Sequence, residues 1–285
     1  MSAVRDPSLR ARILSVTPLR FVRAGSSLVT VRGRLLVVQD DALAVAWVDP
    51  ATLAIEHATL QGFGGPLAKT DKPDFEAAFV DRDGAVVILG SGSTEARCRA
   101  ARLDPATGDA KLEDWTPLYE ALTARLGVRP NVEGAVRVGG TLRLLHRGAG
   151  AGKSAVVDVA IEDAGQRADP PLAVAWHDLG AIEGVPLSFT DAEAVEGGIV
   201  YLAAAEDTPN AVDDGRIAGA AFGVITEDGA RYAVLEEADG TPSRRKVEGL
   251  ALAPGGGEAF VVTDPDDATQ PAELCRVELV GFPVR

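Results

Sequence analysis

Short apolar runs separated by tight polar turns follow one another along almost the whole chain. Runs such as RLLVVQ from Arg34, AVVILG from Ala85 and TLRLLH from Thr141 are rich in Val, Leu and Ile, and Gly or Asp-Gly turns separate them from the preceding runs. This pattern is typical of β-strands joined by hairpins. No helical pattern follows each run, as a parallel α/β sheet would require. The sequence therefore predicts an all-β protein.

Two markers recur with a common period. The first is a glutamate that opens an apolar run, found at Glu76, Glu133, Glu193 and Glu248. The intervals are 57, 60 and 55 residues, and Ser27 takes the equivalent place one period earlier. The second is a turn, DPATL from Asp49 and DPATG from Asp104, with two further copies at a similar spacing. Two markers in constant order indicate an internal repeat.

Each period holds four apolar runs, which is the strand content of one β-propeller blade. The chain length of 285 residues accommodates five such units. We therefore predict a single domain over residues 1–285, a five-bladed β-propeller of four-stranded antiparallel blades. The last unit lacks a fourth strand, and ARILSVTPL near the N-terminus is left over. We expect this N-terminal strand to close the last blade and remove an open sheet edge.

One short helix is predicted near residues 117–126. In TPLYEALTARLG, Leu118, Leu122 and Leu126 share one helical face. Thr116 is the expected N-cap, and Gly127 is the expected end of the helix.

Charge and composition restrict the partners. The chain has 28 basic and 42 acidic residues, a net charge of −14, which disfavours nucleic acid and anionic membranes. Only Cys98 and Cys275 are present, too few for a disulfide framework. The charged N-terminus lacks an apolar signal region, and no run of eighteen apolar residues occurs. We expect a soluble, cytoplasmic protein.

The glutamates are the strongest candidates for a functional site. The first strand of each propeller blade lines the central channel, so equivalent residues should form a ring at one mouth. Carboxylates ~7 Å apart repel by roughly 2 kcal/mol per pair at an effective dielectric of ~20. Protons, basic side chains or a cation must relieve this repulsion. Calcium suits an all-oxygen site, and the expected ligands are Glu76, Glu133, Glu193 and Glu248. Alternatively, each glutamate accepts hydrogen bonds from the neighbouring blade and fixes the blade register.

Other polar residues are expected at the same mouth. A small-molecule ligand, anionic or sugar-like, is the expected partner. The predicted ligand-binding residues are Lys72, Arg97, Asn131, Arg147, Asp207, Lys246 and Asp264. The predicted catalytic residues, for proton transfer, are His146, Asp74 and Asp191.

The [DN]-x-E-[AG] openings followed by apolar strands resemble those of bacterial propellers of the SdiA-regulated and phytase-like esterase families. GSGSTEARCR, the HRG after TLRLL and the AEDT after IVYLA add to this similarity. More distantly, the openings resemble the gluconolactonase and paraoxonase propellers, where a glutamate opening an inner strand binds the channel calcium. The resemblance implies a calcium site at the four glutamates and hydrolysis of small esters. The chain departs from the lactonase pattern in having about five units rather than six and Ser27 where a glutamate is expected. Catalytic assignments are not carried over, because no matching histidine pair is found.

Two functions remain open at this stage, besides a pure scaffold whose mouth would be dry and internally salt-bridged. One is a calcium-dependent hydrolase of esters, lactones or phosphoesters, in which the cation polarises the substrate. The other is a non-catalytic propeller that binds a sugar, peptide or protein at the same mouth. Propellers serve both purposes, so the fold does not choose between them.

Overall fold

The computed structural model describes residues 1–40, 42–60, 74–148, 153–165, 167, 169–208, 215–267 and 269–283. Within these ranges the chain is almost entirely β-strand, with one α-helix, α1 (Thr116–Leu126), and one 3-10 turn, η2 (Glu95–Arg97). The all-β prediction is confirmed. No helix in these ranges is long and apolar enough to cross a membrane.

Three separate sheets each contain four antiparallel strands in chain order. The first is β3 (Gly25–Val31), β4 (Arg34–Gln39), β5 (Ala44–Val48) and β6 (Ile55–Thr59). The second is β7 (Phe75–Val80), β8 (Val86–Gly90), β9 (Arg99–Leu103) and β10 (Ala110–Asp114). The third is β11 (Val132–Val138), β12 (Thr141–His146), β13 (Ser154–Ala160) and β14 (Leu172–His177). Two-residue turns containing glycine join β3 to β4 and β11 to β12, as the Gly turns of the sequence predict, and longer connections follow the second strands.

A larger sheet of nine strands completes the molecule, in the order β17-β18-β19-β20-β2-β23-β22-β21, with β1 beside β20. Its first part is β17 (Ser188–Val195), β18 (Gly198–Asp207), β19 (Arg216–Thr226) and β20 (Gly229–Glu236). Its second part is β21 (Val247–Leu252), β22 (Glu258–Thr263), β23 (Glu273–Val280) and β2 (Arg10–Pro18). The remaining short strands are β1 (Val4–Arg5), β15 (Ala181–Ile182) and β16 (Val185–Pro186).

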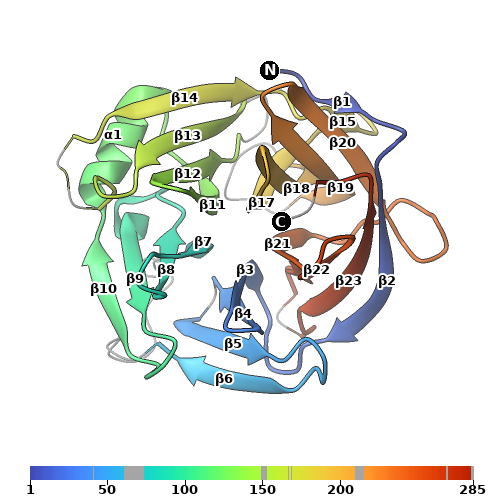
Figure 1. Cartoon of the computed structure of the whole chain (residues 1–285), viewed down its shortest axis with the longest axis horizontal. Coiled ribbons are helices and arrows are strands. Elements are labelled where there is room, and N and C mark those ends of the chain that lie inside the picture. The colour runs from blue at the N-terminus through green and yellow to red at the C-terminus, as the bar shows by residue number, and fades with distance from the viewer. Residues whose placement is uncertain are drawn as a thin grey trace.

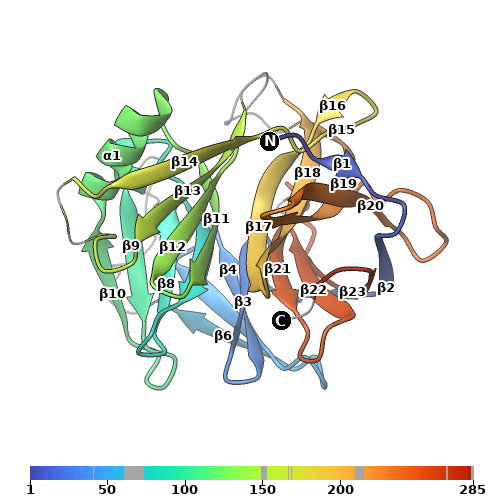
Figure 2. The same ribbon diagram turned by 45° about the horizontal axis from the view of Figure 1, so that its top comes forward.

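The N-terminal strand closes the ring of sheets, as predicted. β2 pairs antiparallel with β23 from Arg10↔Val280 to Pro18↔Glu273. Its contact with β20 is parallel and involves only Ala11 and Arg12. Figure 2 shows β2 running beside β23 at the rim of the molecule. The ends of the chain therefore share one sheet, which protects an edge that would otherwise remain unpaired.

The sheets are arranged around a central axis, and the strands nearest this axis are β3, β7, β11, β17 and β21 (Figure 1). These inner strands contact one another in sequence around the axis. The apolar runs are buried on both faces because each sheet packs between two neighbours. One such cluster joins Val136 and Val156 of the β11–β14 sheet to Phe189 and Ile199 of the next.

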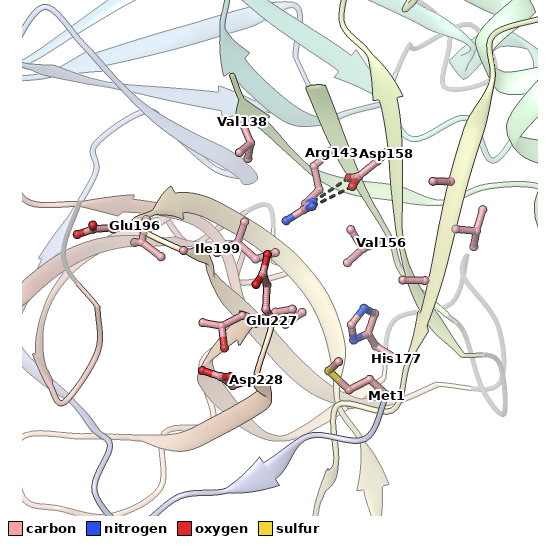
Figure 3. Close-up of a pocket in the computed structure, with 18 residues that line it drawn as sticks. Met1, Val138, Arg143, Val156, Asp158, His177, Glu196, Ile199, Glu227 and Asp228 are labelled. Carbon is pink, nitrogen blue, oxygen red and sulfur yellow. Dashed lines mark hydrogen bonds and ion pairs between the residues drawn. The ribbon is translucent and has the colours of Figure 1, made fainter. Parts of the chain in front are cut away.

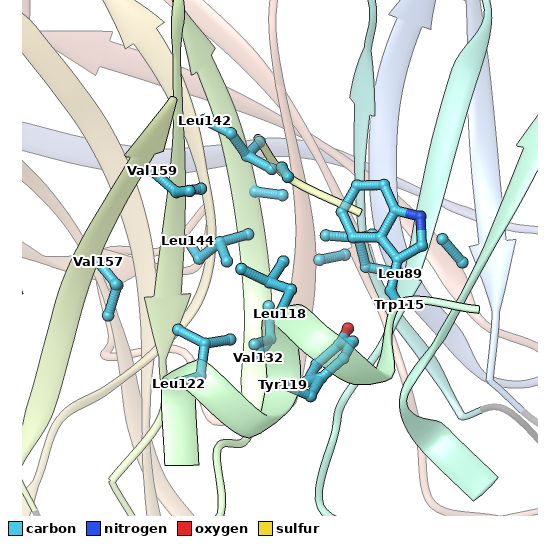
Figure 4. Packing of buried hydrophobic residues seen from close by; sticks show 14 of the residues in the cluster. Leu89, Trp115, Leu118, Tyr119, Leu122, Val132, Leu142, Leu144, Val157 and Val159 are labelled. Atoms are coloured by element: carbon cyan, nitrogen blue, oxygen red, sulfur yellow. The ribbon is translucent and has the colours of Figure 1, made fainter. Parts of the chain in front are cut away.

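Helix α1 covers one edge of the core between the β7–β10 and β11–β14 sheets. Leu118, Leu122 and Leu126 are buried as predicted, together with Trp115 and Tyr119. Figure 4 shows Leu118 and Leu122 beside residues of the β11–β14 sheet. The Tyr119 hydroxyl donates a 2.5 Å hydrogen bond to the carbonyl of Gly90.

The predicted helix cap is wrong at its N-terminus and confirmed at its C-terminus. Trp115, not Thr116, occupies the N-cap, and the carboxylate of Asp114 accepts the N–H of Thr116 at 2.9 Å. Pro117 stands in the first turn, where it removes no helical hydrogen bond. Gly127 ends the helix with φ = 75°, a left-handed conformation that glycine adopts readily.

Candidate functional site

Each inner strand contains a β-bulge near its start, at the same register in every sheet. In β11, for example, Val132 pairs with His146 and Gly134 with Leu145, so the residue between them is extra. A bulge re-aims the side chain of the extra residue. Here the bulge identifies the equivalent residue of each inner strand, whatever side chain that residue carries. The extra residues of the five inner strands are Ser26, Glu76, Glu133, Thr190 and Glu248.

The bulge positions correct the alignment of the repeats, which the sequence analysis had based on the four glutamates. Thr190, not Glu193, is equivalent to Glu76, Glu133 and Glu248. Glu193 lies three residues further along β17, opposite Val200. Its carboxylate accepts the backbone N–H of Leu252 at 2.8 Å. In the first repeat, the equivalent residue is Ser26 rather than Ser27.

Asp191 and Glu193 connect β17 to the inner edge of β21. The Asp191 carboxylate accepts the backbone N–H groups of Leu250 at 2.9 Å and Ala192 at 2.8 Å, and is 2% exposed. Burial raises the pKa of Asp191 well above its usual range, although these amides oppose the shift. Both side chains therefore fit the alternative role of fixing the register of neighbouring strands.

A cluster of acidic side chains gathers where the inner strands begin and the second strands end, on one side of the sheets. Three of its carboxylates, those of Asp40, Asp74 and Glu76, have oxygen atoms that all lie within 4.8 Å of one another. Ion pairs and mutual repulsion connect these three to the others. We use "acidic cluster" for Asp40, Asp74, Glu76, Glu133, Glu206, Glu248, Asp264 and Asp266.

The first part of the acidic cluster is held by the GSGS segment after β8. The Asp74 carboxylate accepts from the Ser91 hydroxyl at 2.8 Å and pairs with the Arg97 guanidinium at 2.6 Å. Arg97 also donates to the Ser93 hydroxyl at 2.8 Å. These contacts hold Asp74 beside Glu76 and place Ser91 and Arg97 next to the acidic cluster.

Arg147 joins two buried glutamates from different sheets. Its guanidinium pairs with Glu206 and lies 3.6 Å from an oxygen of Glu133. The side-chain amide of Asn131 donates to the other Glu133 oxygen at 2.6 Å. Glu206 also accepts the N–H of Gly215 at 2.8 Å. The nearby carboxylates stabilise the charged form of Arg147 and raise its pKa despite burial.

Lys246 is surrounded by three carboxylates. Its ammonium lies 2.5 Å from Asp266, 3.7 Å from Asp264 and 3.8 Å from Oε1 of Glu248. These neighbours raise the pKa of Lys246 despite its burial. The second Glu248 oxygen, Oε2, is buried and has no hydrogen-bond partner within the described ranges. A buried carboxylate oxygen without a donor is costly, and it is a natural ligand position for a cation.

The pKa values show that burial and mutual repulsion disfavour the charged form of the buried glutamates. Burial raises the pKa of Glu76 well above 4.5, and repulsion from Glu133, Asp74, Asp40 and Glu248 adds to the shift. Burial also raises the pKa of Glu133, against the attraction of Arg147. For Glu248 burial brings the pKa to about 8. Within the described ranges, Arg97, Arg147 and Lys246 each pair with carboxylates of the acidic cluster. The raised pKa values nevertheless favour bound protons or a cation.

The geometry does not favour His146 as a general base. Its Nδ1 accepts the backbone N–H of Asn131 at 3.0 Å, so in the neutral ring the proton sits on Nε2. Burial lowers the pKa of His146 to about 4, which keeps the ring neutral near pH 7. The ring also packs edge-on against Trp176, with centroids 6.5 Å apart. These contacts are those of a structural residue.

One predicted ligand-binding residue, Asp207, falls outside the acidic cluster. Asp207 is exposed, and its neighbour Glu206 turns inwards instead. Lys72 lies outside the described residues. No ligand or catalytic role was predicted for Asp40, Glu206 or Asp266, which lie at or just after the ends of the second strands β4, β18 and β22. Adjacent acidic pairs in the sequence gave no indication of which carboxylate points inwards.

Comparison with known proteins identifies the fold and the family. The chain is similar to Myxococcus xanthus glutaminyl cyclase, with 13% identity, 98% of each chain covered and a TM-score of 0.55. It is also similar to a glycosyl hydrolase from Bacteroides ovatus, with 10% identity, 90% of this chain and 84% of that chain covered, and a TM-score of 0.52. These similarities show a β-propeller fold.

The sequence comparisons place the chain in one family. No curated protein sequence matches it. The specific resemblance to SdiA-regulated and phytase-like esterase propellers stays a prediction. The model of a family of unknown function, DUF6929, matches residues 21–279, and the chain therefore belongs to this family.

Proposed function

We propose that the acidic cluster binds a calcium ion and that the protein uses this site to hydrolyse an ester, lactone or phosphoester. The observation that carries the proposal is the convergence of Asp40, Asp74 and Glu76, whose carboxylate oxygens lie within 4.8 Å of one another. The buried Oε2 of Glu248, which receives no hydrogen bond from the described residues, is a second and independent sign of a missing positive partner.

The donor set fits calcium by its chemistry. Carboxylate oxygens are hard ligands, and calcium tolerates six to eight of them in irregular geometry. Asp40, Asp74 and Glu76 would hold the ion, with Glu133 and Glu248 beside it. When bound, such an ion polarises a carbonyl or phosphoryl oxygen and lowers the pKa of water. Glu193, which the sequence placed among the ligands, is left out because it already accepts from Leu252.

The chain's own residues would bind the substrate and move protons. Glu248 is our candidate for general acid–base transfer, because burial raises its pKa to about 8 in the ion-free protein and a calcium ion beside it would bring that pKa down. Asn131 and Arg147 hold Glu133 in place. Because Arg97, Arg147 and Lys246 are all engaged by carboxylates, the cluster favours the neutral members of this set, an ester or a lactone, over an anionic phosphoester.

A non-catalytic role is the second candidate, and the same ion pairs favour it. Carboxylates paired with Arg147 and Lys246 offer acceptors and donors side by side, as a sugar's hydroxyl groups require. In both cases we propose a single domain of five blades. The strands β17–β20 form one blade of the nine-stranded sheet, and β21–β23 with β2 form another, since β2 and β20 share only a two-residue contact.

Thermal melting with a chelator tests the ion site. Calcium at a hundred times its Kd stabilises a fold by about 2.7 kcal/mol, which is roughly 5 °C for a chain of this size. We expect EDTA to lower the Tm of the wild type and calcium to restore it. Glu76→Gln should lose this response, whereas Glu278→Gln, an exposed glutamate paired with Arg10, should keep it. An unchanged wild-type Tm in EDTA contradicts the ion site.

Turnover distinguishes the two candidate functions. A panel of aryl esters, lactones and phosphoesters is assayed with wild type, Glu76→Gln and Glu278→Gln, with and without calcium. Hydrolysis that requires both calcium and Glu76 supports the enzyme. Calcium-dependent stability without any turnover, combined with saturable binding of a sugar, supports the binding protein. Turnover that is indifferent to both calcium and Glu76 rules out this mechanism.

A further inference from the structure

A groove of about 910 Å³ lies between the β11–β14 sheet and the strands β17–β19, away from the acidic cluster. It runs beside β13 and β14 on one side and beside the β17–β18 and β19–β20 turns on the other (Figure 3). No member of the acidic cluster lines it. Its volume is within the range of pockets that hold small molecules.

One part of the groove is apolar. Val156 and Ile199 contribute buried side chains, and Val138 is a large apolar residue that remains 39% exposed. Val195 and Ile225 extend this surface on the other sheet. Figure 3 shows Val138, Val156 and Ile199 around the open centre of the groove. These side chains form two opposite apolar walls, against which the apolar part of a ligand can pack.

His177 provides an unused polar atom in the groove. The residue is 4% exposed, and its Nδ1 atom is buried with no hydrogen-bond partner in the described structure. Its ring packs edge-on against Phe189, with centroids 6.1 Å apart, and Figure 3 shows it directed into the groove. Burial, the Met1 amino group and Arg143 lower its pKa to about 4. The ring is therefore neutral near pH 7 and offers its nitrogen to a ligand.

The charges on the groove are predominantly negative. Glu196, Glu227 and Asp228 are exposed along the turns of the β17–β20 strands. Arg143 lies in the groove as well, but Asp158 holds its guanidinium through two hydrogen bonds of 2.8 Å. The Met1 amino group is likewise engaged, since it donates to the carbonyl of Trp176 at 2.7 Å. A cation is therefore the favoured charged group at the three carboxylates.

We propose that this groove is a second binding site, for a small amphipathic amine. The ammonium of the ligand pairs with Glu227, Asp228 and Glu196, and its apolar body lies against Val138, Val156 and Ile199. A polar group of the body forms a hydrogen bond with Nδ1 of His177. The proposal does not depend on the calcium site, because none of the residues is shared.

Tryptamine is a suitable probe because it combines an ammonium with an apolar ring and an N–H donor. Indole-3-propionate has a similar body with a carboxylate in place of the amine, and serves as the matched control. From the usual affinity per non-hydrogen atom, a ligand of this size is expected to bind with a Kd of about 2 mM. We expect saturable tryptamine binding by NMR titration and none for indole-3-propionate at equal concentrations. Equal binding of the two compounds, or no binding of tryptamine, overturns the proposal.

Variants locate the site. The double variant Glu227→Gln/Asp228→Asn should weaken tryptamine binding about tenfold, because it removes two of the three carboxylates. Glu278→Gln, on the far strand β23, should not change it. In the wild type, the ¹⁵N resonances of the His177 ring should shift on titration, and those of His57 should not. Unaltered affinity in the double variant, or an unmoved His177 ring, rules out this site without bearing on the acidic cluster.

Discussion

Replacing Glu248 by glutamine tests the central electrostatic claim, that the acidic cluster holds more negative charge than the fold accommodates. Burial raises the pKa of Glu248 from 4.5 to about 8, despite attraction by Lys246 and Arg147. In the unfolded chain the same carboxyl is ionised at every pH above 6. The folded protein therefore binds a proton that the unfolded chain does not, and the resulting stability is lost as the pH rises through 8.

The size of this effect follows from the pKa. Between pH 7 and pH 9 the wild type loses about 1.4 kcal/mol through Glu248, since one pKa unit corresponds to about 1.4 kcal/mol. For a chain of this length that is about 3 °C in Tm. Glutamine does not titrate, so the variant keeps its stability in this window. The histidines do not interfere, because wild type and variant carry the same three and their contribution cancels in the difference between the two proteins.

The assay is thermal melting in EDTA at pH 7, 8 and 9 for wild type, Glu248→Gln and Glu278→Gln. We expect the Tm of Glu248→Gln, relative to wild type, to rise by about 3 °C from pH 7 to pH 9. Glu278 is exposed on β23, and its variant should follow the wild type. Parallel curves for wild type and Glu248→Gln refute the argument, because Glu248 would then be ionised across the whole range.

Two further substitutions test the contacts around the channel. Arg147→Met leaves Glu133 and Glu206 without their shared cation and should cost about 3–5 kcal/mol of unfolding free energy at pH 8. Part of this cost should be recovered at pH 5.5, where the raised pKa of Glu133 allows protonation. The assay is urea unfolding, and an equal loss of stability at both pH values contradicts this explanation. Asp191→Ala leaves the buried N–H of Leu250 without its acceptor and should cost about 2–3 kcal/mol in the same assay. A loss below 1 kcal/mol means that Asp191 does not hold β17 to β21.

Much of the fold was predicted correctly because strands, hairpins and helix faces follow from short-range patterns of side chains. Alternating apolar runs and Gly turns specify strands and hairpins, and Leu118, Leu122 and Leu126 specify one helix face. The N-terminal strand could be assigned to the last unit, because that unit lacked an outer strand. The N-cap was misassigned, because Asp114 accepts the Thr116 N–H from outside the helix and only the loop geometry decides this.

The candidate site was predicted only in outline. Periodic glutamates brought Glu76, Glu133 and Glu248 to one mouth, since a repeat places equivalent residues at equivalent points. Glu193 was misplaced because hydrogen-bond register, not residue type, sets equivalence, and the bulge in β17 selects Thr190. A one-residue slip in a strand reverses the direction of every side chain, so a pattern of glutamates alone does not fix the ring.

The sequence by itself determined the strands, their order and the acidic character of one mouth, because each depends on side-chain periodicity and repeat spacing. The tertiary structure alone decided which carboxylates meet. Asp40, Asp74 and Glu76 converge because the end of β4 and the start of β7 come together across a sheet boundary. The same is true of the buried nitrogen of His177, whose surroundings come from two sheets. Such contacts depend on the angle and spacing between sheets, which no local pattern specifies.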